Sequence, residues 1–573
     1  MKSFPVRLNI SWLQRCYQQQ TLTPHEVIKE ILARTERYLE YNIWITPPSW
    51  ALLHRYLKNL EELDPQECPL WGIPFVIKDN IDLAGVPTTA GCATYAYTPQ
   101  KSAFVVQKLL KAGAIPVGKT NLDQFATGLV GMRSFYGEVH NSLRPEFISG
   151  GSSSGSAVAV SLGLSAFALG TDTAGSGRVP AALNCLIGYK PSLGAWSTQG
   201  VVPACASLDA VTVFAGSLKD VEIVNEVVRG FDKKCCWSKE IIKPVKTLPK
   251  KICLPKNNLE FFGDFAADYQ EKWQQAVYRL KMMGIVVEEI DIELFQRVAS
   301  LLYDGPWIAE RWQDLGEFVQ EHLQDVFPVT EKILRSGDMP EYTAAKTFGA
   351  MHELQRYKTL VYQLLQDAVL IMPTTGGTFT RNEVRANPIE TNAQMGLYTN
   401  HCNLLDLCAI AIPENDQDFE LPFGITMFAR ADREGLILKL AEEFLSSQSK
   451  DIAVCGLHMK GMPLEYQLTN LGAEYAETCQ TTATYKLVWL EDEPARPGLV
   501  YTGKGRSIEV DIYHLPIKAW GSFIANIKSP LGIGDIHLAD GRIVKGFLCE
   551  DYFASRVKDI STFGGFRKFV EQK

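Results

Sequence analysis

The chain has 573 residues, too many for one ordinary domain, and 46% hydrophobic with 21% charged residues is the composition of a globular protein. A net charge of −8 without a dense lysine and arginine run argues against nucleic-acid binding, and no apolar run is long enough to predict a membrane span or a signal peptide. The thirteen cysteines form no paired CxxC motifs, so we expect no metal site, mostly buried and inert thiols, and a cytoplasmic protein.

Helices and strands alternate over the first three quarters of the chain. Thr23 to Glu26 predicts a helix start, with Thr23 as the cap, Pro24 in the first position and Glu26 closing a capping box. Apolar periodicity then predicts helices over 102–111, 157–163, 268–282 and 344–366, and strands over 114–120, 166–170, 286–292 and 368–372. This alternation predicts an α/β fold with a sheet covered on both faces.

The predicted secondary structure changes from mixed helices and strands to mostly strands near residue 450. A helix over 436–445 precedes the polar residues 446–450, which we interpret as a linker. Beyond it, strands are expected over 485–490 and 507–514, and over 534–548 on both sides of a hairpin turn at Asp540-Gly541. The sequence therefore predicts two domains, 1–448 and a small, β-rich α+β domain over 453–573.

The most informative stretch is GGSSSGSAVAVSLGLSAFALGTDTAGSGRVP, residues 150–180, in which two serine clusters bracket one apolar segment. Upstream, WGIPFVIKDN places Lys78 at the end of an apolar, strand-like run. A serine nucleophile requires a base and an oxyanion pocket, and a lysine accepts a proton only when its pKa is lowered. Lowering that pKa by roughly three units costs about 4 kcal/mol, which burial can impose. The alternative is that Lys78 pairs with Asp79 or Asp82 at a solvated strand end.

The turn from Asp172 to Ser176 is the candidate oxyanion pocket, because the backbone N–H groups of Thr173, Ala174 and Gly175 can point inward there. Asp172 is expected to hold this loop. No histidine lies near it in the sequence, which disfavours a Ser-His-Asp triad.

The pattern GGSS, DTAGS and RVPA, together with the lysine of GIPFVIKDN, resembles the amidase signature family over roughly residues 71–444. The resemblance implies an amidase-signature fold, with a large mixed sheet covered by helices, and hydrolysis of carboxamides. It also implies that Ser176 is the acylated nucleophile, Ser152 the serine after a cis peptide, and Lys78 the base. One departure is Ala174, where the family usually has a glycine, which narrows the freedom of the turn.

Substrate selection is expected from cationic side chains. Arg178, two residues after the nucleophile, is a candidate for binding a carboxylate through two hydrogen bonds. The stretch LLYDGPWIAERW places Tyr303 just before a helix that Pro306 is expected to start, and Arg311 within that helix. The alternative is an ordinary amphipathic helix in which Arg311 pairs with Glu310 or Glu317.

This second stretch and the C-terminal segments CGLHMKGMPLEYQL, SPLGIG, VKGFLCE and ISTFGGF resemble the allophanate hydrolase branch of the family. The resemblance implies a small anionic amide substrate, allophanate (urea-1-carboxylate), bound at its carboxylate by Tyr303 and Arg311, and no cofactor. It also implies a second domain that promotes breakdown of the N-carboxycarbamate product, and a functional link to a separate urea carboxylase. His458 is either a catalytic base or a packed loop residue, and a homodimer is left open.

Three other functions stay open at this point. The chain is an amidase of another specificity, an amidotransferase subunit that delivers ammonia to a partner, or a scaffold that kept the fold and lost the chemistry. The joint presence of Lys78, Ser152 and Ser176 disfavours the scaffold.

Overall fold

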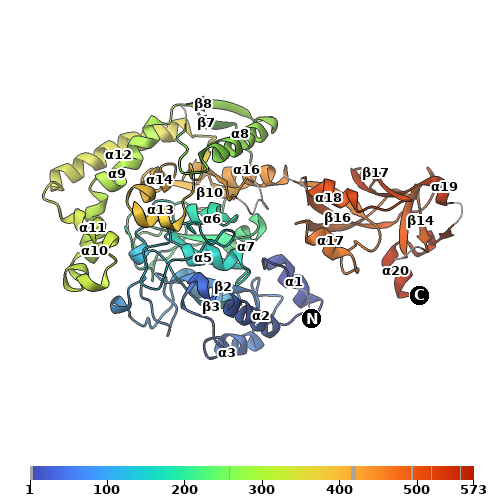
Figure 1. Cartoon of the computed structure of the whole chain (residues 1–573), viewed down its shortest axis with the longest axis horizontal. Coiled ribbons are helices and arrows are strands. Elements are labelled where there is room, and N and C mark those ends of the chain that lie inside the picture. Colours follow the sequence, from blue (N-terminus) through green and yellow to red (C-terminus); the bar gives the residue numbers. More distant parts are fainter. Residues whose placement is uncertain are drawn as a thin grey trace. The chain divides into compact units, whose positions relative to one another are not determined.

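The structure is a computed structural model that describes residues 4–256, 259–414, 421–447, 449–491, 495–517, 519–554 and 557–572. The side chains of residues 303, 304 and 554 also lie outside this description. The chain forms two units, Met1–Glu442 and Glu443–Lys573, and Figure 1 draws the second in orange-red and red.

One mixed sheet organises the first unit. Within the described residues it has eleven strands, in the order β1 (Trp44–Thr46), β3 (Ile115–Thr120), β2 (Pro74–Lys78), β4 (Phe167–Asp172), β6 (Ala210–Ala215), β5 (Ile187–Lys190), β10 (Leu407–Pro413), β11 (Gly424–Arg430), β9 (Ala368–Pro373), β7 (Lys251–Pro255) and β8 (Val286–Ile290). Strand β2 runs parallel to both β3 and β4, and β7 runs parallel to both β8 and β9. Parallel strands need cover on both faces, which is why β2, β3 and β4 are buried along their whole length.

Helices cover this sheet. They are α1 (Ile10–Gln18), α2 (Pro24–Arg37), α3 (Trp50–Asn59), α4 (Phe104–Lys111), α5 (Ser154–Ser161), α6 (Val179–Leu183), α7 (Leu218–Val228), α8 (Ala266–Met282), α9 (Glu293–Asp304), α10 (Trp307–Glu321), α11 (Pro328–Arg335), α12 (Ala344–Leu364), α13 (Arg381–Ala386), α14 (Glu390–Met395), α15 (His401–Leu404) and α16 (Glu434–Ser446). The capping box expected at Thr23 is present at the start of α2. Helix α5 packs on β2, β3, β4 and β6 and is buried throughout, which its small residues SGSAVAVS allow. Helices α9 to α12 lie together on one side of the unit (Figure 1).

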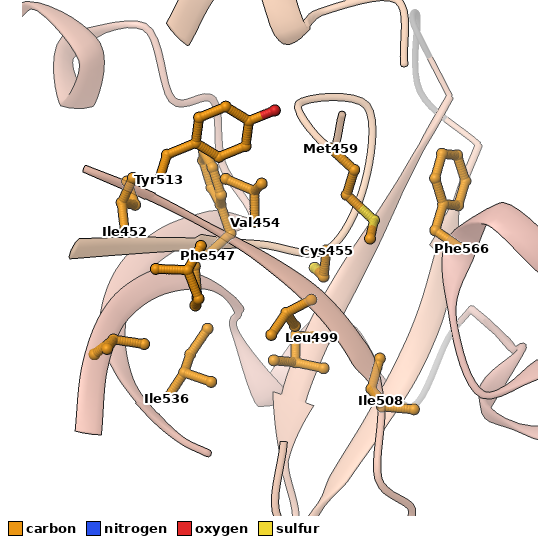
Figure 2. Packing of buried hydrophobic residues seen from close by; sticks show 14 of the residues in the cluster. Ile452, Val454, Cys455, Met459, Leu499, Ile508, Tyr513, Ile536, Phe547 and Phe566 are labelled. Carbon is orange, nitrogen blue, oxygen red and sulfur yellow. The ribbon is translucent and has the colours of Figure 1, made fainter. Parts of the chain in front are cut away.

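The second unit is β-rich, as the sequence predicts. A five-stranded sheet has the order β13 (Glu474–Gln480), β16 (Glu509–Pro516), β12 (Ser449–Val454), β18 (Ile543–Cys549) and β17 (Leu531–His537), and a three-stranded sheet has the order β15 (Arg496–Tyr501), β14 (Tyr485–Leu490) and β19 (Lys558–Asp559), counted over the described residues. Its helices are α17 (Glu465–Thr469), α18 (Ala519–Ala525), α19 (Asp551–Ala554) and α20 (Phe566–Glu571). Figure 2 shows its apolar core, to which β12, β16 and β18 contribute Ile452, Tyr513 and Phe547. The expected hairpin turn joins β17 to β18, with Gly541 at a φ of +92°.

Two local expectations were wrong. The polar residues 446–450 do not form a five-residue linker, because β12 begins at Ser449 and pairs Ser449 with Pro516 and Lys450 with Leu515. Backbone hydrogen bonds decide this pairing, and polar side chains do not oppose it. Pro306 is the residue that caps α10 and not its first helical residue. Tyr303 precedes α10 as expected, but it lies within the last turn of another helix, α9.

The thirteen cysteines are all free thiols, and most of them are buried, as expected. Among the described residues, no helix combines the length and the apolar character that crossing a bilayer requires.

Candidate active site

Lys78 ends strand β2 and is fully buried. Its Nζ lies 2.8 Å from Ser152 Oγ and donates a hydrogen bond of 2.7 Å to Thr171 Oγ1. Burial lowers the pKa of Lys78 to about 7, and the negative charges of Asp123, Asp209 and Asp172 only partly oppose this. Near neutral pH a large fraction of Lys78 is therefore uncharged and able to accept a proton.

The alternative pairing of Lys78 with its neighbouring aspartates is wrong. Asp79 forms an ion pair with Lys119, at 3.0 Å between Nζ and Oδ1, and accepts hydrogen bonds from Thr89. Asp82 accepts hydrogen bonds from the hydroxyl groups of Thr88 and Tyr97. Both carboxylates are thus engaged by other groups, which leaves Lys78 directed at the hydroxyl groups of Ser152 and Thr171.

Ser152 follows a cis Gly151–Ser152 peptide, as the resemblance implies. Its carbonyl accepts a hydrogen bond of 3.1 Å from Asp123 N, and Asp123 in turn accepts from the backbone N–H groups of Gly131 and Arg133. The neighbouring Ser153 has a different task, since its Oγ donates to the Thr171 carbonyl at 3.1 Å. The serine loop therefore presents Ser152 alone to the lysine and uses Ser153 to join the loop to strand β4.

Ser176 lies in the turn between β4 and α6, and its Oγ is 3.5 Å from the carbonyl oxygen of Gly128. In the part of the chain that the structure describes, the backbone N–H groups of the expected donors Thr173, Ala174 and Gly175 donate no hydrogen bond, and neither does that of Ser176. Backbone donors without an acceptor beside a serine hydroxyl are what an oxyanion pocket requires.

The turn accommodates alanine at one position and needs glycine at the next. Ala174 is buried in an apolar cluster that includes Cys205 and Leu208, so its methyl group has a packed environment. Gly175 has a φ of +145°, and a Cβ there would collide with the Thr399 side chain. The departure from the family pattern at Ala174 is thus absorbed by packing.

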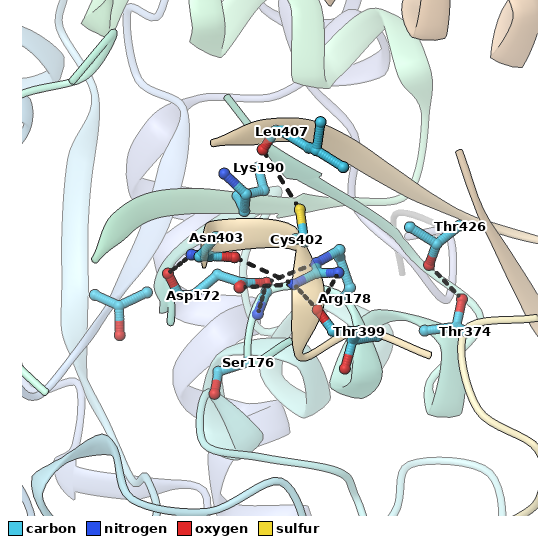
Figure 3. A network of polar contacts seen from close by, with 12 residues as sticks. Asp172, Ser176, Arg178, Lys190, Thr374, Thr399, Cys402, Asn403, Leu407 and Thr426 are labelled. Carbon is cyan, nitrogen blue, oxygen red and sulfur yellow. Dashed lines mark hydrogen bonds and ion pairs between the residues drawn. The ribbon is translucent and has the colours of Figure 1, made fainter. Parts of the chain in front are cut away.

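Arg178 forms a buried ion pair with Asp172 (Figure 3). Its Nε and Nη2 donate to the two Asp172 oxygens at 2.9 Å each, and its Nη1 and Nη2 reach the Thr399 carbonyl at 3.3 Å. Burial disfavours ionisation of Asp172, but the guanidinium outweighs it and holds the Asp172 pKa below its usual value. Because this buried guanidinium already binds Asp172 and Thr399, the contacts favour a structural role, and the expected contact of Arg178 with the substrate carboxylate stays a prediction.

Arg311 is almost completely buried on α10. Its charge reaches Asp209, where burial raises the carboxyl pKa to about 6 and Arg311 acts in the opposite direction. Glu310 accepts hydrogen bonds from Ser207 N and Oγ, at 2.8 and 2.6 Å. The Tyr303 side chain lies outside the described residues, so its expected role stays a prediction.

Sequence reasoning missed Thr171 and Asp209. Thr171 lies near the end of β4, the parallel neighbour of β2, so the shared carboxyl edge of these strands is the signal that could have found it. Asp209 accepts a hydrogen bond from Thr173 Oγ1, in the candidate oxyanion turn. Nothing in the local sequence joins these two residues, which lie on different segments.

His458 lies in the second unit in an aromatic environment. Its ring stacks on Phe547, with centroids 5.4 Å apart, and meets Phe523 edge-on. Its Nε2 is 2.9 Å from Gln467 Oε1, and burial lowers its pKa. These contacts favour the packed loop residue over the catalytic base.

Each of the two units matches the model of a known protein family. The model of the amidase family matches residues 26–438, and the model of the allophanate hydrolase C-terminal domain matches residues 450–571. The urea amidolyase of Saccharomyces cerevisiae is 38% identical over 92% of this chain, but the chain spans only 31% of that protein.

Two further relatives are matched over most of their own length. The structure of Kluyveromyces lactis allophanate hydrolase has a TM-score of 0.72 and 36% identity, with 99% of both chains covered. One component of the glutamyl-tRNA(Gln) amidotransferase of Lactobacillus johnsonii is 31% identical over 77% of this chain and 96% of its own.

Proposed function

This chain belongs to the amidase family, and we propose that it hydrolyses allophanate, urea-1-carboxylate, to ammonia and carbon dioxide. The observation that carries the proposal is the combination of two features: the buried Lys78–Ser152 pair beside the Ser176 turn, and a C-terminal unit of the allophanate hydrolase type. The likeness to K. lactis allophanate hydrolase over 99% of both chains supports it.

In the proposed reaction Ser176 Oγ attacks the terminal carboxamide carbon. Ser152 takes the Ser176 proton and passes its own proton to the neutral amine of Lys78, which the 2.8 Å separation between Lys78 Nζ and Ser152 Oγ allows. Negative charge develops on the former carbonyl oxygen, and the N–H groups of Thr173, Ala174 and Gly175 stabilise it. One proton returns from Lys78 through Ser152 to the leaving nitrogen, so ammonia departs and an acyl-Ser176 intermediate stays behind.

Water then attacks the acyl carbon, and Lys78 and Ser152 again accept and return one proton, which releases N-carboxycarbamate. A lysine with a pKa near 7 suits this task, since it must be uncharged to accept the proton and charged to return it at the same pH. Breakdown of N-carboxycarbamate releases one further ammonia and two carbon dioxide. One allophanate and one water thus give two ammonia and two carbon dioxide overall. We propose that the second unit promotes this step, with His458 as the candidate proton carrier, although its packing favours a structural role.

Arg311, with Tyr303, is proposed to bind the substrate carboxylate. A buried guanidinium whose charge acts on Asp209, which is bonded to the nucleophile turn, supports this place for an anionic group. A substrate carboxylate would accept charge-assisted hydrogen bonds from this guanidinium, and these are stronger than the bonds that a neutral amide can accept.

The amidotransferase component is the second candidate, because the L. johnsonii relative is matched along 96% of its length. The C-terminal domain match over residues 450–571 favours the hydrolase. For the remaining partners, the likeness to urea amidolyase supports a functional link to a urea carboxylase, and a homodimer stays a prediction that sedimentation of the purified chain would test.

Ammonia release from allophanate by the purified chain tests the function directly. We expect turnover of allophanate, slower turnover of a neutral amide of similar size, and no ammonia from glutamine. Faster hydrolysis of the neutral amide would favour an amidase of another specificity, and release from glutamine would favour the amidotransferase.

A further inference from the structure

Asp209 is a buried carboxylate immediately before strand β6. Its Oδ1 accepts a hydrogen bond from the hydroxyl of Thr173, the first residue of the nucleophile turn. Its Oδ2 accepts from Ala204 N at 2.8 Å, and Cys205 N lies 3.3 and 3.2 Å from the two oxygens. One side chain thus holds two segments together: the turn that carries Ser176 and the loop over residues 204–208.

The loop 204–208 is attached in turn to helix α10. Glu310 accepts from Ser207 N and Ser207 Oγ, and Cys205 Sγ donates to it at 3.2 Å. Glu310 is the residue directly before Arg311. A chain of hydrogen bonds therefore runs from Thr173 through Asp209 and the 204–208 loop to the helical turn that presents Arg311.

The opposite end of the nucleophile turn has its own anchor. Asp172 Oδ2 accepts from Gly177 N at 2.9 Å and also binds Arg178. This second anchor reaches Thr399 and Asn403, on the segment around α15. Asn403 Nδ2 donates to the carbonyl oxygens of Asp172 and Leu208 at 2.8 Å each, so this anchor also reaches the 204–208 loop, through the backbone. Asp209 differs in that one carboxylate binds both the Thr173 side chain and the loop directly.

The charges around Asp209 come from several elements. Lys78 faces it from β2, Arg311 from α10, and the Cys205 thiol from the adjoining loop. Asp123 and Asp172 are the other carboxylates that act on Lys78. The negative charge of Asp209 thus acts on the lysine base and on Arg311.

We propose that Asp209 is a positioning residue that aligns the backbone donors of the Ser176 turn with Arg311. Its negative charge also acts on Lys78. Asp209 acts through the Thr173 hydroxyl and does not touch the substrate. The inference deepens the proposed function and rests on it, because it assumes that the turn and Arg311 serve one substrate.

The Thr173 hydroxyl offers a matched pair of variants. Thr173→Ser keeps the donor to Asp209, whereas Thr173→Val removes it at nearly the same volume. We expect Thr173→Val to lower kcat about tenfold or more with little change in KM, because a hydrogen bond to a charged group is lost while Arg311 stays in place. Thr173→Ser should retain most of the wild-type kcat.

Asp209→Asn supplies the second readout, the pH profile. Removing the negative charge near Lys78 favours its neutral form, so the acid limb of kcat/KM should move to lower pH even though kcat falls. A purely structural role would lower the active fraction of the protein without moving that limb. Thermal unfolding of each variant separates the loss of folded protein from the loss of rate.

A serine-directed fluorophosphonate probe gives a readout that does not depend on the substrate. The rate of labelling of Ser176 should fall in Thr173→Val and be restored in Thr173→Ser. Wild-type labelling without ammonia release from allophanate would refute the proposed substrate alone, and the Thr173 pair would still test Asp209. Equal labelling and equal kcat in the two Thr173 variants would overturn the positioning role of Asp209, and an unshifted acid limb in folded Asp209→Asn would refute its action on Lys78.

Discussion

Arg178 and Asp172 form a buried ion pair with two hydrogen bonds of 2.9 Å, and Ser176 lies on the turn between them. Because Asp172 also accepts from Gly177 N, the pair closes the turn around the nucleophile. A residue that the sequence assigns to the substrate is thus part of the support of the turn.

Arg178→Ala should destabilise the fold, because it leaves the Asp172 carboxylate buried without its partner. The expected loss is about 3–5 kcal/mol in the free energy of unfolding, measured by denaturant titration. Its activity per folded molecule should fall by a similar factor on allophanate and on a neutral amide. A selective loss on allophanate would return Arg178 to the substrate site.

Arg311→Ala, unlike Arg178→Ala, should lose activity selectively on allophanate. Losing a charged contact to the carboxylate costs about 1.5–3 kcal/mol, so kcat/KM for allophanate should fall about tenfold or more. The loss on a neutral amide of similar size should be much smaller. Arg178→Ala is the control, and equal losses on both substrates in Arg311→Ala would make Arg311 structural as well.

Ser176→Ala should abolish turnover and leave the unfolding transition in place. Ser153→Ala is the matched control: Ser153 Oγ bonds the Thr171 backbone, so its removal should cost about 1 kcal/mol of stability and keep most of the activity. Mass spectrometry of an acyl-enzyme trapped on Ser176 would check the assignment. An active Ser176→Ala protein with an inactive Ser153→Ala protein would move the nucleophile.

Lys78→Met should remove activity and stabilise the fold. The wild-type rate should rise with pH through about 7, since only the neutral amine accepts the serine proton. The burial that lowers this pKa costs about 4 kcal/mol of the free energy of unfolding at pH 7, and Lys78→Met removes that cost. The variant also loses two hydrogen bonds, at about 1 kcal/mol each. We therefore expect a net gain of about 2 kcal/mol in the free energy of unfolding at pH 7.

The sign of the pH dependence follows from the lowered pKa. Unfolded Lys78 binds a proton below about pH 10.4, whereas folded Lys78 binds one only below about 7. The wild type therefore gains stability as pH rises from 7 to 10, and its deficit against Lys78→Met should shrink over that range. A deficit that is constant with pH, or a fully active variant at pH 7, would refute the neutral lysine.

The division of labour between the two units is testable with residues 1–448 and with His458 variants. The truncated chain should still release the first ammonia from allophanate, and N-carboxycarbamate should then decay more slowly than with the full chain. His458→Phe keeps an aromatic ring against Phe547 and Phe523 but carries no proton, so it separates packing from proton transfer. Carbon dioxide release that is equal in His458→Phe and wild type would make His458 structural, and equal release by the truncation would remove any chemical role from the second unit.

Local features were determined by the sequence. The capping box at Thr23, the apolar strand that ends at Lys78, the strand predicted over 166–170 and found over Phe167–Asp172, and the hairpin turn at Gly541 depend on residues a few positions apart. The local pattern therefore suffices to predict that they exist. The family pattern likewise identified Lys78, Ser152 and Ser176 as a set, because each lies in a contiguous motif.

Only the tertiary structure decided which partners the charged side chains bind and how far their pKa values shift. Arg178 is bound by Asp172 and by Thr399 from a segment far along the chain, and Asp209 joins Thr173 to the loop held by α10. The pKa of Lys78 depends on enclosure by β4, α5 and the serine loop, and the pairing of Ser449 depends on the presence of β16. These properties arise from desolvation and from partners that are distant in sequence, and no local pattern of side chains records either of them.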